Sequence, residues 1–393
     1  MKKLTQSLLF SSMLVTYSAH ADIAFNGFAS IVGGVTTSND EQLDGYDNTL
    51  SFDEGSLFAI QASSELGEGL SVTAQILSRG ENDWKPDFEW AYVAYEANDN
   101  LRLLAGRQRI PFYMYSDFLD VSYAYPWISP PAGVYSTVIN TFDGIGAIYS
   151  TNLDEFDVVV HGIYGNSDGE ISVDTELTGK ADAIFDNITG ASMAVTRDWL
   201  TLRAAYFQAD STIGLLRLQP LVDGWSAAGF NDIADNISVF EDKSEFVEFG
   251  FQAIFDTVQV IGEYTELTTA NTTVGDEDSY YIMVSKQFDT ILASITYAVD
   301  EDHADAITGG VPTGVAVNLP TGYPDAFYTT DGLIALTNGA TDAQEVDVTS
   351  ITLGLRWDFH DSAALKFEYI DYSDDLNSDN DTGLLKAALV TVF

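Results

Sequence analysis

The chain has 393 residues, of which 60 are Asp or Glu and 16 are Lys or Arg, so its formal net charge at pH 7 is −44. This balance argues against a nucleic-acid partner, because neutralising phosphate requires Lys and Arg. The absence of cysteine excludes disulfides, catalytic thiols and thiolate metal sites.

The first 21 residues have the features of a secretory signal peptide. Lys2 and Lys3 give a positive start, Leu4–Val15 is apolar, and Ala19-His20-Ala21 fits a small-x-small cleavage site. The apolar stretch is too short to span a membrane. We therefore expect export, a mature chain that begins at Asp22, and a single domain over residues 22–393 with 14 basic residues (16 minus Lys2 and Lys3).

Sixteen later runs have the two-residue periodicity of β-strands. In one of them, Val247, Phe249 and Phe251 alternate with Glu248 and Gly250. The strands of soluble β-sandwiches show the same alternation, so the pattern alone does not distinguish a sandwich from a barrel. The alternative counts are fourteen and eighteen strands. The predicted strands are 22–35, 55–65, 70–79, 87–96, 101–108, 142–151, 156–165, 189–197, 200–210, 244–255, 258–267, 278–288, 291–300, 346–359, 363–373 and 383–393.

The connectors between these runs alternate between short and long. Residues 97–100 and 256–257 are short connectors, whereas 109–141, 211–243 and 301–345 are long and polar. One rim of an antiparallel sheet would then consist of short turns and the other of long loops, as in outer-membrane barrels. No later segment has the roughly 20 apolar residues of a membrane helix, so a membrane protein of this sequence must be a closed barrel.

Aromatic residues beside the short turns also favour a barrel, since such girdles mark the membrane–water boundary. They are Phe156, Trp199, Phe255, Phe288, Trp357, Phe359 and Phe393. We predict an all-β fold, a transmembrane antiparallel β-barrel of sixteen strands. A barrel of this size is wide enough for a water-filled channel.

Two local features resemble the Gram-negative general porin superfamily, which comprises 16-stranded trimeric outer-membrane channels. The last run stops at Phe393, and Gly106-Arg107-Gln108 ends the fifth run before a long connector. The resemblance implies that the barrel-assembly machinery reads Phe393. It also implies a homotrimer among outer-membrane lipid and lipopolysaccharide, with the third outside loop (109–141) folded inward. The loop tip of enteric members, Pro-Glu-Phe-Gly-Gly, is replaced here by Tyr-Pro-Trp-Ile-Ser-Pro-Pro over residues 125–131.

The candidate pore constriction combines loop carboxylates with wall arginines. Asp117 and Asp120 lie in the third long connector, Arg79 and Arg203 have the lumen-facing parity of their strands, and Arg107 matches a wall arginine by the resemblance. Opposed charges across a narrow gap create a transverse field that sorts solutes. In the alternative interpretation, these arginines bond loop carbonyls and fix the fold, and the loop aromatics pack against the wall instead of forming a sugar-stacking surface.

The outside connectors are acidic, and clustered oxygens could attract Ca²⁺ or Mg²⁺, but a solvated, repulsive surface explains them without a specific metal site. The mature histidines, His161, His303 and His360, lack metal-ligand spacing. We therefore predict no enzyme and no cofactor.

We expect an outer-membrane porin for passive diffusion of small hydrophilic solutes and ions, weakly cation-selective. The alternatives are a ligand-selective channel, an outer-membrane enzyme or a surface-binding barrel.

Overall fold

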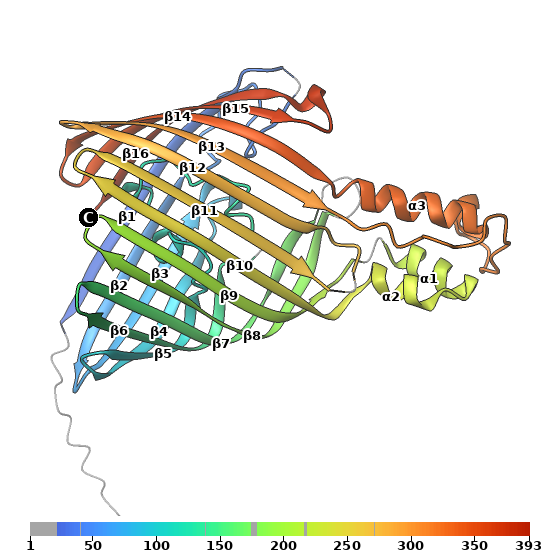
Figure 1. Cartoon of the computed structure of the whole chain (residues 1–393), viewed down its shortest axis with the longest axis horizontal. Helices are drawn as coiled ribbons and strands as arrows, with labels where there is room; N and C mark the ends of the chain where they lie inside the picture. The colour runs from blue at the N-terminus through green and yellow to red at the C-terminus, as the bar shows by residue number, and fades with distance from the viewer. Residues whose placement is uncertain (1–21, 40, 138, 174–178, 216–217, 271) are drawn as a thin grey trace, which may run out of the picture.

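The computed structural model describes residues 22–39, 41–137, 139–173, 179–215, 218–270 and 272–393. The signal peptide predicted over residues 1–21 lies outside them. The chain forms one antiparallel sheet that β1 (Ile23–Thr36) closes by pairing with β16 (Thr382–Val392) (Figure 1). The predicted barrel of sixteen strands is confirmed.

Each remaining strand pairs with its neighbours in the sequence, as expected for a barrel built from successive hairpins. They are β2 (Leu57–Gly67), β3 (Leu70–Arg79), β4 (Pro86–Asn98), β5 (Leu101–Arg109), β6 (Thr141–Leu153), β7 (Phe156–Val173), β8 (Gly179–Arg197), β9 (Leu200–Ile213), β10 (Val239–Phe255), β11 (Val258–Thr269), β12 (Asp276–Phe288), β13 (Ile291–His303), β14 (Val346–His360) and β15 (Ala363–Asp374).

The two faces of the wall differ as the alternation predicts. On β14, Ile351, Leu353 and Leu355 expose 43%, 51% and 44% of their surface on the outside. Arg356, between Leu355 and Trp357, points inward and reaches the carbonyl of Tyr123 at 2.7 Å. An apolar outer row around a polar inner row is the reverse of a soluble sandwich, and it requires an apolar surrounding.

Aromatic pairs lie beside the short turns. The rings of Trp199 and Phe255 are 4.8 Å apart, and those of Trp357 and Phe359 are 5.6 Å apart. All four side chains are exposed. This arrangement gives the short-turn rim the aromatic girdle that the sequence predicts.

The long connectors contain more strand and helix than the sequence predicts. Strands β7, β8 and β10 extend into the segments 166–188 and 211–243, which lie between the predicted strands. Helices α1 (Gln219–Ala228) and α2 (Asn231–Ile237) follow β9, and α3 (Thr330–Asp342) precedes β14. No helix among the described residues is long and apolar enough to cross a membrane.

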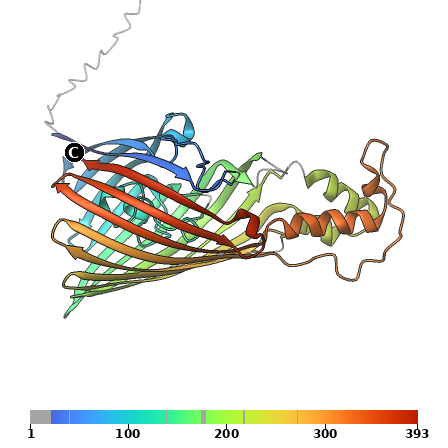
Figure 2. The same cartoon turned by 90° about the horizontal axis from the view of Figure 1, so that it is seen from above.

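The three helices form a small body that projects from the long-loop rim (Figures 1 and 2). Leu221 and Trp225 of α1, Ile237 of α2 and Leu333 of α3 are buried together. The indole of Trp225 donates to the hydroxyl of Thr337 at 2.8 Å. Two connectors far apart in the sequence therefore share one apolar core, which stabilises the projection.

The orientation of the barrel can be tested by labelling, since the chain has no cysteine of its own. Asp305→Cys and Asp379→Cys place thiols at exposed positions on the long-loop side, and Asn98→Cys places one at the opposite rim. A membrane-impermeant maleimide added to intact cells should label the first two and leave the third unmodified. Labelling of Asn98→Cys alone would reverse the orientation.

The C-terminal residue helps to close the barrel. Phe393 and Gly27 exchange two backbone hydrogen bonds, at 2.8 and 2.9 Å, across the seam between the first and last strands. Deleting Phe393 removes both bonds and the aromatic end that we expect to be recognised during assembly. Outer-membrane yield should fall and periplasmic aggregate should rise on fractionation, whereas Phe393→Tyr should insert normally. Equal insertion of all three proteins would contradict this role.

Candidate functional site

The connector between β5 and β6, residues 110–140, lies inside the barrel and touches inward-facing residues of strands on opposite sides of the wall. Two short 3₁₀ turns, Ser116–Phe118 and Ser122–Ala124, shape it. We call it the inner loop. Three groups of charged wall residues and the buried Glu263 hold it, and together they define the candidate site.

The first group, the Arg203 anchor, holds the beginning of the inner loop. Arg203 of β9 donates to the carbonyls of Pro111 and Phe112 at 2.5 and 2.8 Å, and its guanidinium pairs with Glu248 of β10 at 2.5 Å. Glu248 is fully buried. A buried charge is tolerated only when it is paired and hydrogen-bonded, so the loop carbonyls complete the solvation of this arginine.

A buried glutamate on the next strand ties the two limbs of the inner loop together. Glu263 of β11 accepts from the backbone N–H of Met114 at 2.8 Å and from the hydroxyl of Tyr135 at 2.7 Å. Met114 lies in the first part of the inner loop, soon after β5, and Tyr135 lies in the last part, shortly before β6. One carboxylate therefore fixes both limbs against the same side of the wall.

The second group is the Arg79–Asp120 cluster. Arg79 of β3 contacts Glu89 at 2.6 Å and Asp120 at 2.8 Å, and Arg109 contacts Glu89 at 3.0 Å and also pairs with Asp120. Burial acts to raise the pKa of Asp120, but the neighbouring Arg109 and Arg79 guanidiniums outweigh it and hold that pKa below its usual value. Asp120 is therefore ionised. The two arginines contact Glu89 and Asp120, and Glu81 is a third carboxylate, 3.9 Å from Arg79.

The third group, the Lys366 anchor, holds the far turn of the inner loop. The ammonium of Lys366 on β15 is 1% exposed and donates to the carbonyls of Ser122, Tyr125 and Trp127. Arg356 of β14 donates to the carbonyl of Tyr125 at 3.1 Å. Both side chains therefore face the lumen and bind backbone groups of the inner loop.

Most aromatic residues of the inner loop are buried against the wall, whereas Phe118 is exposed beside the lumen. Trp127 is 2% exposed, its indole donates to Thr296 of β13 at 2.8 Å, and its ring meets that of Tyr281 at 5.4 Å. Tyr115 and Tyr125 are buried beside it. These rings fix the loop in place, and they do not form an exposed stacking surface.

A hollow of about 460 Å³ runs beside the inner loop on the short-turn side. Asp117 of the loop faces it, opposite Gln61 of β2, Gln75 of β3 and Trp90 of β4. Arg109 and Asp120 line the same space, and Phe393 lies at its far end. We call it the Asp117 hollow. Its place in the lumen and its charged residues Arg109, Asp117 and Asp120 make it the candidate water path, and apolar residues such as Phe118 and Leu119 complete its lining.

The structure separates the five residues predicted for the constriction. Arg79 and Asp120 are in direct contact, and Asp117 faces the neighbouring hollow. Arg203 binds loop carbonyls, as the alternative interpretation has it.

Arg107 lies apart from the other four. It forms a two-point ion pair with Asp143 of β6, at 3.0 and 2.8 Å, and lies on the same face of β5 as the exposed Leu103 and Ala105 of the outer row. Arg109, the last residue of β5, is the second arginine that contacts Asp120, beside Arg79. Arg109 was not among the predicted constriction residues, because the sequence places it at the start of the long connector.

Among the described residues, no three His, Cys, Asp or Glu side chains are grouped so that they could hold a metal ion. The site consists of fixed charges and the hydrogen bonds that orient them. Such groups can bind, orient and sort solutes in a narrow lumen.

A family model described as "Gram-negative porin" matches residues 9–380. No curated protein sequence matches the chain. Many solved structures share the fold at low identity. A trimer form of OmpT from Vibrio cholerae is 12% identical with a TM-score of 0.54, and the match covers 95% of this chain and 99% of that one.

Two further structures are similar to the chain to the same degree. An anion-selective porin from Comamonas acidovorans is 13% identical with a TM-score of 0.58, covering 95% of this chain and 100% of that one. OmpF of Salmonella typhi, in complex with daunomycin, is 14% identical with a TM-score of 0.56, covering 96% and 99%. At these identities the structures establish the fold alone.

The anchoring of the inner loop can be tested at Lys366. Lys366→Met removes the donor that three loop carbonyls share, and leaving buried groups unpaired costs on the order of 3 kcal/mol. We expect a lower thermal midpoint, measured by heat-dependent gel mobility, and larger open-channel current noise in planar bilayers. Lys286→Met, the same change at an exposed position of β12, is the control. Equal behaviour of the two variants would show that the anchor contributes nothing.

Proposed function

Because the chain belongs to the Gram-negative porin family, we propose that it gives small hydrophilic solutes and ions a passive route across the outer membrane, with a weak preference for cations. Porins are non-enzymatic channels of the outer membrane, and this chain is one of them. The observation that carries the proposal is the inner loop, which charged wall residues hold inside the lumen beside the Asp117 hollow.

The proposed constriction consists of Asp117, Asp120 and Arg79, with Arg203 fixing the loop behind them. Arg79 is 26% exposed on its side chain, whereas Arg109 is 4% exposed. Arg79 therefore keeps one side open to passing solutes while its other side pairs with Asp120. Asp117 adds a carboxylate without a basic partner among the ion pairs of the described residues.

The cation preference follows from charge balance. The 60 acidic residues outnumber the 14 basic residues that follow residue 21, and a negative entrance raises the local cation concentration. The two arginines of the Arg79–Asp120 cluster face three carboxylates, those of Glu89, Asp120 and Glu81, so the cluster does not oppose this effect. The preference should be largest at low salt, since the screening length falls from about 10 Å at 0.1 M to about 3 Å at 1 M.

The remaining parts of the proposal concern assembly and surroundings. We propose that residues 1–21 are cleaved near Ala21 during export, that the barrel-assembly machinery recognises Phe393, and that residues 22–393 then form one barrel domain. A homotrimer in outer-membrane lipid and lipopolysaccharide is supported by the trimer form of the similar OmpT structure.

Selectivity is testable by reversal potential across a KCl gradient in planar bilayers. The potential should indicate cation preference at low ionic strength and shrink as salt rises. Asp117→Asn should reduce the preference, because it removes the unpaired charge beside the water path. Asp99→Asn, which neutralises an exposed carboxylate in the turn after β4, is the control.

Two outcomes would contradict the proposed selectivity. Anion selectivity at every salt concentration would mean that Arg79 and its neighbouring arginine dominate permeation. Equal potentials for Asp117→Asn and the unmodified protein would mean that ions pass elsewhere.

A further inference from the structure

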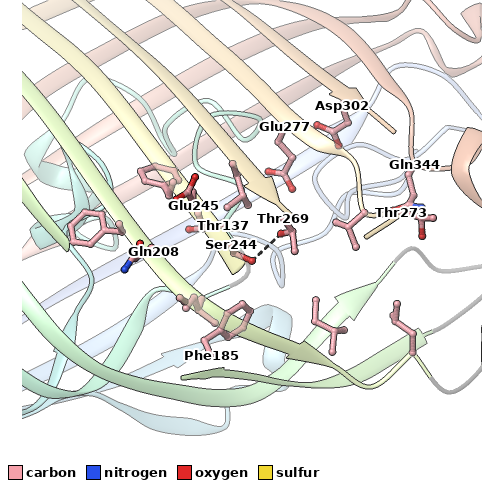
Figure 3. Close-up of a pocket in the computed structure, with 18 of the residues that line it drawn as sticks. Thr137, Phe185, Gln208, Ser244, Glu245, Thr269, Thr273, Glu277, Asp302 and Gln344 are labelled. Carbon is pink, nitrogen blue, oxygen red and sulfur yellow. Dashed lines mark hydrogen bonds between the residues drawn. The ribbon is translucent and has the colours of Figure 1, made fainter. Parts of the chain in front are cut away.

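A second cavity, of about 410 Å³, lies on the long-loop side of the inner loop. Its floor includes Phe112 and Ile139 of that loop, and its outer edge includes Leu218 before α1 and Ala343 after α3. Figure 3 shows it between strands β8 to β13. The volume is within the range of small-molecule sites. We call it the outer cavity.

Most of the outer cavity is apolar, although it lies in the lumen of a channel for hydrophilic solutes. Phe185 of β8, Phe207 of β9, Phe246 of β10 and Leu267 of β11 line one side. The ring of Phe112 packs on those of Phe207 and Phe246 at 5.3 and 4.6 Å, which fixes the shape of this side. A surface of this kind favours an aromatic or aliphatic body over water.

The opposite side of the outer cavity carries two carboxylates. Glu277 of β12 and Asp302 of β13 are direct cross-strand partners and both line the cavity, as Figure 3 shows. Like charges in this position repel each other. Glu277 accepts one hydrogen bond, from Ser136 at 3.0 Å, whereas Oδ1 of Asp302 is buried without a partner.

No Lys or Arg is present among the described residues that line the outer cavity. The third carboxylate in the lining, Glu245, is already engaged with Lys243 at 2.9 Å and with Tyr206 at 2.7 Å. Glu277 and Asp302 are therefore the two acids that a bound cation would neutralise. A buried acceptor without a partner is costly, and a charged donor satisfies it most strongly.

We propose that the outer cavity binds an organic cation whose apolar body packs on the aromatic side and whose ammonium group pairs with Glu277 and Asp302. The cation relieves the repulsion between the two carboxylates and supplies the missing donor to Asp302. This inference deepens the proposed channel function, because a cation held here lies at the outer entrance of the lumen, above the inner loop.

Three probes with the same phenylbutyl body and different heads test the proposal: 4-phenylbutylammonium, 4-phenylbutanol and 5-phenylpentanoate. Each is titrated into the folded, detergent-solubilised full-length barrel by isothermal titration calorimetry, with empty micelles as the blank. The ammonium probe should bind at least about 10-fold more tightly than the alcohol, and the carboxylate should bind least. Equal affinity for the ammonium and the alcohol, or tighter binding of the carboxylate, overturns the proposal.

The double variant Glu277→Gln with Asp302→Asn removes the proposed counter-charges. It should lower the affinity for the ammonium probe by about 10-fold or more and leave the affinity for the alcohol unchanged. The matched control is Asp278→Asn with Glu301→Gln, the adjacent cross-strand acidic pair on the same two strands. Neither residue of that pair lines the cavity. An equal loss in both double variants would indicate a general charge effect and overturn the site.

A third variant tests the apolar side without changing charge. Ala209→Phe places a ring in the cavity from β9 and should weaken the binding of both the ammonium and the alcohol probes. Undiminished binding would place the probes elsewhere. Conductance measured on the same preparations separates this inference from the channel function: normal conductance without ammonium binding rejects the cation site alone, and binding without conductance rejects the channel alone.

Discussion

Buried charge inside the barrel is the constraint on which the rest of the structure depends. A charged group removed from water must be paired or surrounded by donors or acceptors, and the inner wall of this barrel carries Arg203, Glu248, Glu263 and Lys366 almost without exposure. The inner loop supplies the missing partners, mainly through its own backbone groups. The wall and the loop therefore require each other, and the position of the loop decides where water can pass.

The wall could be predicted from the sequence because membranes impose simple rules. Lipid satisfies no backbone polar group, so the strands must alternate, pair with their neighbours and close. The run that forms β10 carries this pattern clearly, and the short turns between the runs fix one rim. The inward parity of Arg79 and Arg203 follows from the same alternation.

The partners of those residues could not be predicted, because they depend on the path of thirty loop residues through space. The fifth strand shows the difficulty: Arg107 and Arg109 are two positions apart, yet the first pairs with Asp143 on the outer row and the second turns into the barrel with Asp120. Helices α1 and α3 were missed for a related reason. Each is short, and the burial of Trp225 against Thr337 comes from a connector distant in the sequence.

The two spaces on either side of the inner loop differ in character. The Asp117 hollow combines carboxylates and amides with apolar side chains such as Phe118 and Val121, whereas the outer cavity is lined mainly by aromatic and aliphatic side chains with two carboxylates at one edge. A solute entering from outside would meet the apolar surface first and the charged constriction second. The helices contribute to the rim of the outer cavity, so they take part in shaping the entrance.

The central claim is that ions pass beside the inner loop at Asp117. Asp117→Cys provides the chain's single thiol, and single-channel current can be recorded while a bulky methanethiosulfonate reagent is added. Conductance should fall stepwise as each channel is modified. It should recover when a reductant removes the reagent. Confirmed modification of the thiol with no change in conductance would contradict the central claim.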